Sequence, residues 1–198
     1  MRICMPCLTV ALLALQSLKA AVPRPIIDNA VPAVVLLVMQ DSHGQPLSQG
    51  SGFFVTKDII ASNYHVVEGA SGGYAKAVGK TTKYSLKGIV AADPRCDIVL
   101  LQTDSEQGSS IPIGDSSVLS IGQDVFVVGN PMGLEGSVSA GILSGIRKVG
   151  SDSILQVTAP ISPGSSGGPV LNESGQVVGV AVAAFKVGQN LNFAVPGV

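Results

Sequence analysis

The sequence predicts an all-β protein, built as an antiparallel barrel or a pair of barrels. Short runs of β-branched and apolar residues recur along the chain, and each run is closed by Gly, Pro, Asn or Asp. No stretch shows a 3.6-residue amphipathic period over three helical turns. The 24 Gly and 12 Pro among 198 residues fit a chain with many turns.

The predicted strands follow one another at short intervals. They are VVLLVM (34–39), GFFVT (52–56), IIAS (59–62), YSLKGIV (84–90), DIVLLQ (97–102), DVFVVG (124–129), SVSAGILSGI (137–146), ILQVT (154–158), VVGVAVAAF (177–185) and LNFAV (191–195). A boundary is expected between Ser105 and Ser117, where the polar stretch EQGSSIPIGDSS interrupts the series. It divides residues 21–198 into two comparable halves.

The N-terminus predicts a secretory signal peptide over residues 1–20. Arg2 precedes an apolar run from Leu8 to Leu18, and the small residues Ala20 and Ala21 follow it. The run is shorter than the ~20 residues that a membrane-spanning helix needs. Removal of this segment would take away two of the three cysteines and leave Cys96 without an intrachain disulfide partner. We therefore expect a periplasmic or secreted protein.

Charge and motifs exclude several function classes. The formal net charge is −1, and the twelve Lys and Arg are scattered, which argues against nucleic acid or an anionic membrane as a partner. The nearest approach to a phosphate loop, Gly73 to Thr81, has its glycines one residue too far apart. No metal site and no cofactor are predicted.

Nucleophilic catalysis by serine requires a base to take the hydroxyl proton and a third group to orient that base. Only two histidines exist: His43 lies in the polar turn DSHGQP, whereas His65 follows a predicted strand. Asp97 opens the strand DIVLL and is the preferred acid, because a strand fixes its position. The competing acid, Asp93, precedes a proline and is typical of a turn.

The stretch ISPGSSGGPVLN (161–172) contains the candidate nucleophile. Gly164 to Gly168 formally match GxSxG, the nucleophile elbow of α/β-hydrolases, but that fold places its histidine after the serine. No histidine follows Ser166, so the elbow is excluded. The remaining order is His65, Asp97, Ser166.

Five segments in this order resemble the trypsin-like serine proteases, most closely their HtrA/Deg branch. They surround His65 (GSGFFVTKDIIASNYHVVEGA), Asp97 (CDIVLLQT) and Ser166 (TAPISPGSSGGPVLNESGQVVGV), and include VVGNPMGLEGSVSAGILSG and LNFAVP. The resemblance implies two antiparallel six-stranded barrels with the active site in the cleft between them. It also implies Ser166 as nucleophile and the amides of Gly164 and Ser166 as the oxyanion hole.

The resemblance further implies a serine endopeptidase that hydrolyses peptide bonds of exported or unfolded proteins. The stretch VTAPIS (157–162) holds no acid, so preference for Lys or Arg is not expected. Candidate substrate-binding residues, which would form a small apolar pocket, are Ala159, Ile161, Ala181, Ala183 and Phe193. The alternative of a different class is a catalytically silent protease-like module that binds peptides; a hydrolase acting on esters is a weaker possibility.

Two features depart from the HtrA pattern. Ser165 stands where Asn is common, and the chain stops after FAVP, where these proteins usually continue into PDZ domains. Regulation through such a domain is therefore not expected. The expected partner is a protein or peptide substrate.

Overall fold

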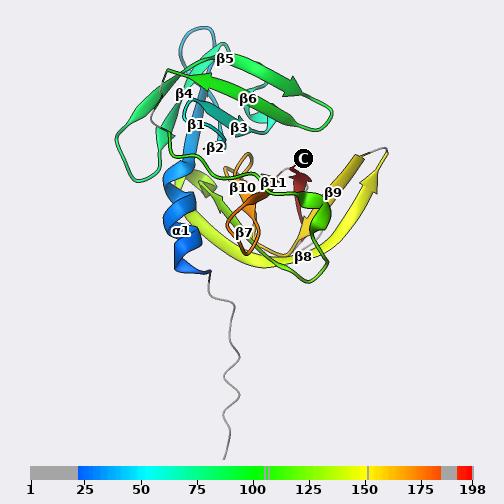
Figure 1. Cartoon of the computed structure of the whole chain (residues 1–198). Coiled ribbons are helices and arrows are strands. Elements are labelled where there is room, and N and C mark those ends of the chain that lie inside the picture. The colour runs from blue at the N-terminus through cyan, green and yellow to red at the C-terminus, as the bar shows by residue number, and fades with distance from the viewer. Residues whose placement is uncertain (1–21, 105, 107, 151, 184–190, 198) are drawn as a thin grey trace, which may run out of the picture.

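Two closed antiparallel barrels make up the protein. The computed structural model describes residues 22–104, 106, 108–150, 152–183 and 191–197. The strand orders are β1-β2-β3-β6-β5-β4 and β10-β11-β12-β9-β8-β7 (Figure 1). The prediction of a mainly β protein with two six-stranded barrels is confirmed.

The first barrel uses the N-terminal half of the described chain. Its strands are β1 (Val34–Gln40), β2 (Pro46–Phe54), β3 (Ile59–Ser62), β4 (Gly72–Ala77), β5 (Lys83–Asp93) and β6 (Ile98–Thr103). A short helix, α2 (Tyr64–Val67), follows β3, and α1 (Arg24–Ala30) with the 3₁₀ turn η1 (Val31–Ala33) precedes β1.

The second barrel follows a connection that contains the 3₁₀ turn η2 (Ser116–Val118). Its strands are β7 (Asp124–Gly129), β8 (Ser137–Val149), β9 (Asp152–Val157), β10 (Pro169–Leu171), β11 (Val177–Val182) and β12 (Asn192–Pro196), with η3 (Pro131–Gly133) between β7 and β8. β6 ends at Thr103 and β7 begins at Asp124. The expected boundary at 105–117 lies between these two strands. Residues 105 and 107 are not among the described residues.

Burial along the strands follows from their places in the barrels. Alternate residues of β6 are buried, because one face of the strand points into the barrel and the other does not. All six residues of β11 are buried. This strand therefore lies between two packed surfaces, which its composition of Val, Ala and Gly allows.

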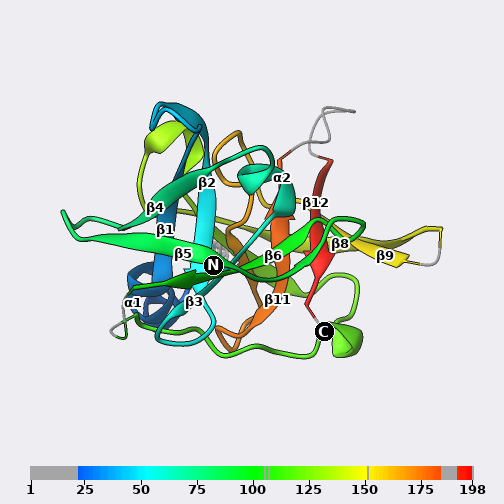
Figure 2. The same cartoon turned by 90° about the horizontal axis from the view of Figure 1, so that it is seen from above.

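The two barrels share one apolar core. Phe53 of β2 and Phe126 of β7 belong to the same buried cluster, together with Ile26 of α1 and Ile111 of the connection. The interior of each barrel also has a buried apolar cluster of its own. The cluster of the first barrel includes Leu37, and that of the second barrel includes Leu143. In the view from above, α2 and β6 of the first barrel overlap in projection with β11 and β12 of the second barrel (Figure 2).

Several elements depart from the sequence-based expectation, among them β4, β10 and α1. β4 contains Gly72 and Gly73, which disfavour strands, and is held by pairing with β1 and β5. β10 has only three residues, which lie between β7 and β11. α1 has seven residues, too few to show a period over three turns, and is anchored by buried Ile26 and Ala30.

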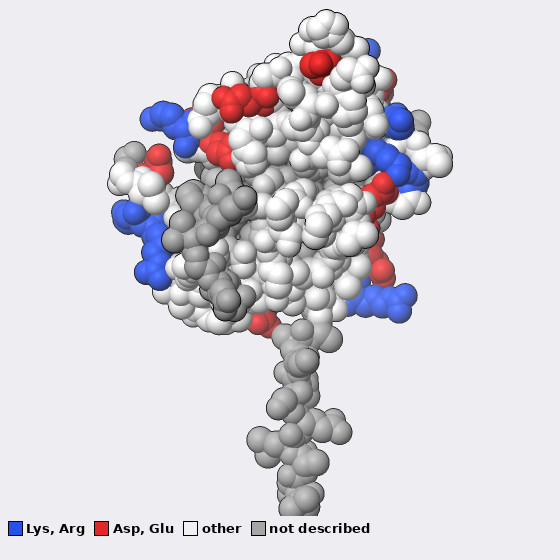
Figure 3. Space-filling model, turned by 180° about the vertical axis from the view of Figure 1, so that it is seen from behind, with Lys and Arg blue, Asp and Glu red and all other residues white. Residues whose placement is uncertain are grey.

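Charged side chains are spread thinly over the face opposite to that of Figure 1. Lys, Arg, Asp and Glu lie mainly around its margin, and the middle of the face is uncharged (Figure 3). Within the described residues, no helix is both long and apolar enough to cross a membrane.

Candidate active site

His65 and Asp97 form a close pair at the end of the first barrel. His65 lies in the short helix α2, and Asp97 immediately precedes β6. His65 Nδ1 lies 2.7 Å from Asp97 Oδ2, and the His65 backbone N–H donates to Asp97 Oδ1 at 2.9 Å. With Nδ1–H donated to the carboxylate, Nε2 is left as the free proton acceptor of the ring.

The backbone of Asp97 is held in a conformation that non-glycine residues rarely adopt. Its φ is +54°. Such strain typically costs of order 1–3 kcal/mol and persists only where the surroundings fix it. Here the carbonyl oxygen of Asp97 accepts from Asn63 Nδ2 at 2.9 Å and from the Tyr64 amide at 3.2 Å. These bonds, with those from His65, aim the carboxylate at the imidazole.

Neither rival titratable residue joins this pair. Asp93 caps the turn before Asp97, where its Oδ1 accepts from the amides of Arg95 and Cys96 at 2.9 and 3.3 Å. These backbone hydrogen bonds lower the pKa of Asp93. His43 is exposed in the β1–β2 turn. The structure thus brings Asp97, the preferred acid, to His65.

Ser166 lies in a tight turn between β9 and β10, on the side of the second barrel that faces α2. A Cβ atom at Gly50 would lie 2.7 Å from Val66 Cγ2 and 3.2 Å from the Ser166 carbonyl oxygen, so the residue next to His65 and the serine turn share one small region. Ser166 is 7% exposed. Its Oγ accepts a hydrogen bond from the Ala183 amide at 3.0 Å.

The turn around Ser166 leaves two amides available. Ser165 N donates to Ser162 O, Gly167 N to Ala181 O and Gly168 N to Ser165 O, at 2.8 to 3.0 Å. Among the described residues, the amides of Gly164 and Ser166 have no hydrogen-bond acceptor. Two unpaired N–H groups in one turn can receive a developing negative charge.

Position 164 requires a glycine. Gly164 has a φ of +95°, and a Cβ there would lie 2.6 Å from Asn130 O and 2.9 Å from Met132 N. Both atoms belong to backbone, which cannot move aside as a flexible side chain could.

The predicted substrate-binding residues differ in exposure. Ala159 and Ala181 are fully buried in the core of the second barrel, and Ile161 packs against that core. Ala183 and Phe193 are partly exposed, and Phe193 pairs with Val182 across β11 and β12. Residues 184 and 185, which follow Ala183 in the predicted strand 177–185, lie outside the described chain.

A cavity of about 410 Å³ borders the His65–Asp97 pair. It lies between the two barrels, and most of its wall is apolar. Besides the pair it is lined by Arg95, Cys96, Val149, Asp152, Ser153, Ile154, Val182 and Val195. The side chain of Asp97 is 27% exposed, so the pair is not sealed from solvent.

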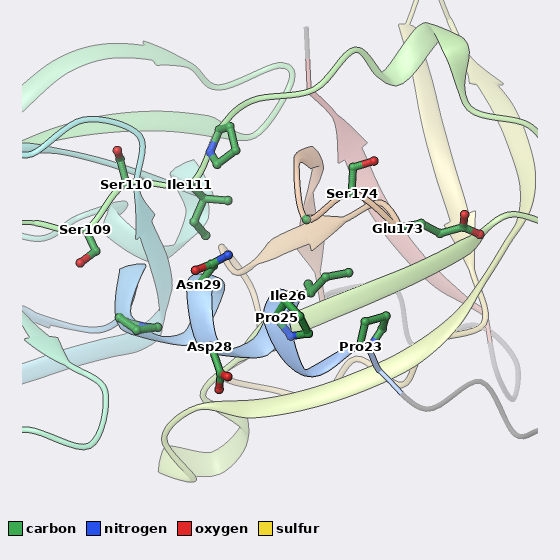
Figure 4. Close-up of a pocket in the computed structure, with 13 residues that line it drawn as sticks. Pro23, Pro25, Ile26, Asp28, Asn29, Ser109, Ser110, Ile111, Glu173 and Ser174 are labelled. Carbon is green, nitrogen blue, oxygen red and sulfur yellow. The ribbon is translucent and has the colours of Figure 1, made fainter.

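A larger cavity, of about 680 Å³, lies elsewhere. Side chains from α1, from the connection at 109–112 and from the turn at 173–175 line it, among them Asp28, Ile111 and Glu173 (Figure 4). None of the residues expected in catalysis belongs to it. Within the described residues, no group of three or more His, Cys, Asp or Glu side chains could hold a metal ion.

Two buried polar residues beside the serine turn could not be singled out from the sequence. Ser51 and Asn130 are both 0% exposed and hydrogen bond to one another. Ser51 lies between two glycines just before the predicted strand 52–56, and Asn130 lies between a glycine and a proline just after the predicted strand 124–129. Polar residues are common in such turn-like positions, so the sequence gives no signal that these two are buried.

Comparisons with known proteins identify the family of this chain. Residues 50–180 match the family model of the trypsin-like peptidase domain. The chain is 37% identical over 169 residues to a probable periplasmic serine endoprotease DegP-like of Bartonella henselae, covering 80% of this chain and 33% of that protein. It is 34% identical over 205 residues to the chloroplastic Protease Do-like 1 of Arabidopsis thaliana, covering 92% and 46%.

Among solved structures, the HtrA-type protease AlgW with tripeptide superposes with a TM-score of 0.78 at 26% identity. The match covers 87% of this chain and 59% of that one. The chain thus spans a third to somewhat over half of the length of these relatives. By the match to its family model and by these relatives, the chain belongs to the trypsin-like peptidases, in their HtrA/Deg-like branch.

Proposed function

We propose that this protein is a serine endopeptidase that cleaves exported or unfolded proteins through His65, Asp97 and Ser166. The observation that carries the proposal is the arrangement of one turn. It contains Ser166 and the amides of Gly164 and Ser166, which have no acceptor among the described residues, and it lies on the side of the second barrel next to His65, whose ring Asp97 orients. The relatives named as serine endoproteases support the same reaction.

The proposed reaction is acyl transfer. His65 Nε2 takes the proton of Ser166 as Oγ attacks a peptide carbonyl carbon, and the amides of Gly164 and Ser166 hold the resulting oxyanion. His65 then returns the proton to the leaving amine, and Asp97 stabilises the imidazolium. Water, activated by His65, hydrolyses the acyl-enzyme in the second half of the reaction.

The first step needs a change of side-chain orientation. Ser166 Oγ is bonded to the Ala183 amide, and no described hydrogen bond joins it to His65. Rotation about the Cα–Cβ bond of Ser166 would release Ala183 and turn Oγ toward the imidazole. Catalytic hydrogen bonds of this kind are often completed only when substrate is bound.

The substrate pocket is proposed to accept a small apolar side chain. Ala159, Ile161, Ala181, Ala183 and Phe193 supply no charge, so a Lys or Arg side chain would find no partner among them. The similar protease AlgW was solved with a tripeptide, which supports a peptide ligand for this chain as well. A periplasmic location is proposed from the names of the bacterial relatives and from the predicted signal peptide, which lies outside the described residues.

Intact-mass measurement after treatment with a fluorophosphonate tests this function. Wild type and Ser165→Ala are expected to gain one adduct, and Ser166→Ala none, because only Ser166 has the position of the nucleophile. Peptides that differ only in Val or Lys before the cleaved bond then test the pocket, with Val expected to be cleaved faster. A folded wild type that binds peptide but gains no adduct would establish the silent peptide-binding module instead.

A further inference from the structure

Ser51, in strand β2 of the first barrel, contacts the serine turn of the second barrel through two groups. Its amide donates to the Ser166 carbonyl oxygen at 2.7 Å, and its Oγ donates to the Gly164 carbonyl oxygen at 2.7 Å. The residue is 0% exposed. One residue of the first barrel therefore holds the carbonyls of both residues whose amides are unpaired.

The Ser51 hydroxyl uses its full hydrogen-bonding capacity. A serine hydroxyl offers one donor and two acceptor positions. Besides donating to Gly164, Oγ accepts from the Asn130 amide at 2.9 Å and from Asn130 Nδ2 at 3.1 Å. Replacement by a side chain without a hydroxyl would leave three buried polar groups short of a partner, which is costly away from water.

Through its hydrogen bonds with Asn130, Ser51 also constrains the peptide unit that precedes Gly164. Asn130 begins the turn η3, in which the Met132 amide donates to the Pro163 carbonyl oxygen at 2.9 Å. That carbonyl lies in the same planar peptide unit as the Gly164 N–H. The peptide units on both sides of Gly164 are thus fixed, one directly by Ser51 and one through the Asn130 turn.

Asn130 is itself rigidly placed, so it can transmit this constraint. Its Nδ2 also donates to Val35 O at 2.9 Å in the first barrel, and its Oδ1 accepts from the Gly136 amide at 3.0 Å. Ser51 is held from its other side, because Ser62 Oγ donates to Ser51 O at 2.7 Å. The network therefore crosses the joint between the barrels and ends at the serine turn.

We propose that Ser51 is a positioning residue for the oxyanion hole: its hydroxyl fixes the peptide units on both sides of Gly164 and so sets the direction of the Gly164 amide relative to the Ser166 amide. This inference rests on the proposed function. It also means that the oxyanion hole is complete only when the two barrels are docked, because the group that fixes it comes from the barrel without the nucleophile.

The test compares Ser51→Ala and Ser51→Cys with wild type. Ser51→Ala is expected to lower kcat for a peptide substrate, and the rate of fluorophosphonate labelling, by about 10- to 100-fold. This is less than the ~10²–10³ typical for loss of a direct oxyanion donor, since the amides themselves remain. KM, and peptide affinity measured on a Ser166→Ala background, are expected to change less than about twofold. Ser51→Cys keeps a weak donor of similar shape and is expected to lie between wild type and Ser51→Ala.

Thr103→Val is the matched control. Thr103 is also a buried hydroxyl residue of the first barrel, and its Oγ1 donates to Asp58 O at 3.0 Å, away from the serine turn. It is expected to lower the unfolding temperature without changing kcat. Thermal unfolding of every variant shows which ones are folded, and Ser51→Cys carries the comparison if Ser51→Ala does not fold.

Two results would overturn the assignment while leaving the proposed function intact. One is a wild-type kcat in a folded Ser51→Ala. The other is a fall in kcat that Thr103→Val reproduces at the same loss of thermal stability. A wild type that gains no fluorophosphonate adduct overturns the proposed function, and the role of Ser51 falls with it.

Discussion

Gly164 combines an unusual backbone conformation with a proposed role in catalysis, because its amide is a proposed donor of the oxyanion hole. Its φ of +95° is open to glycine and rarely adopted by other residues. The space around its α-carbon is occupied by backbone of the 130–132 turn. A side chain at this position would meet both obstacles at once, whereas a side chain at Gly175 would meet only the first.

Gly164→Ala and Gly175→Ala separate these two obstacles. Gly175 has a φ of +74°, but a Cβ there would lie 3.7 Å from the nearest atom, a side-chain carbon of Ile26. We expect Gly175→Ala to lower the free energy of unfolding by about 1 kcal/mol, from backbone strain alone, and to keep the labelling rate of wild type. Gly164→Ala is expected to abolish labelling, because the clash displaces the Gly164 amide.

Denaturant unfolding and fluorophosphonate labelling of both variants check this prediction. Full labelling of Gly164→Ala would contradict it, and so would loss of labelling in a folded Gly175→Ala.

At the scale of elements, the segment from Asn130 through η3 to the start of β8 links the serine turn to the first barrel. Glu135 of this segment forms an ion pair with Lys76 of β4, and its Oε2 accepts from the Gly79 amide at 3.1 Å. The hydrogen bond from Lys76, followed by that from Gly79, lowers the pKa of Glu135. Because Asn130 and Met132 lie in the same segment, this anchor helps to hold the turn that supports Gly164.

The anchor predicts a pH-dependent contribution to stability. Because the pKa of Glu135 in the folded protein lies below its ordinary value of 4.5, the ionised carboxylate stabilises the fold above pH 4.5. That stabilisation is lost as the pH falls through the lower folded-state pKa. Wild type is therefore expected to unfold at a higher temperature than Glu135→Gln at pH 7, and the difference is expected to close as the pH falls below about 4.5.

Thermal unfolding of both proteins from pH 7 to pH 3 measures this difference. Glu173→Gln removes the charge of an exposed residue in the turn after β10 and serves as the control. A difference between wild type and Glu135→Gln that stays constant over this pH range would show that the ion pair is not its source.

At the scale of the whole molecule, the shared core makes the two barrels interdependent. Phe53 of the first barrel and Phe126 of the second lie in one buried cluster with residues of α1 and of the connection. The Ser51 network crosses the same joint. Neither barrel can expose its side of the joint without losing apolar burial and buried hydrogen bonds.

We therefore expect the protein to unfold in one cooperative transition. Phe126→Ala should lower the free energy of unfolding by about 3–5 kcal/mol, the usual cost of removing a buried phenylalanine side chain, and should still show one transition. Ile121→Ala, at a side chain that is 68% exposed, is expected to change it by less than about 0.5 kcal/mol. Differential scanning calorimetry checks this, and two separate transitions in wild type would contradict it.

Much of the fold could be predicted from the sequence because the strands are short, β-branched and separated by turn residues. The runs at β1, β6, β7 and β12 are predicted close to where the structure has them. β4 could not be predicted, because its glycines have no strand preference of their own and become a strand only through their neighbours. The helix α1 could not be predicted either, because its seven residues are stabilised by the packing of Ile26 and Ala30 against the rest of the protein.

The sequence by itself determined the residue types of the site and their order: one histidine after a strand, an acid at the start of another, and a serine among glycines. Those properties are local, so periodicity, turn chemistry and spacing reveal them. Only the tertiary structure decided that Asp97, rather than Asp93, forms a hydrogen bond with His65. It also decided that the Ser166 hydroxyl accepts from the Ala183 amide. Likewise, only the structure shows that the Ser51 hydroxyl donates to the Gly164 carbonyl oxygen. These contacts join segments far apart in the chain, and their partners are fixed by how two barrels dock rather than by neighbouring residues.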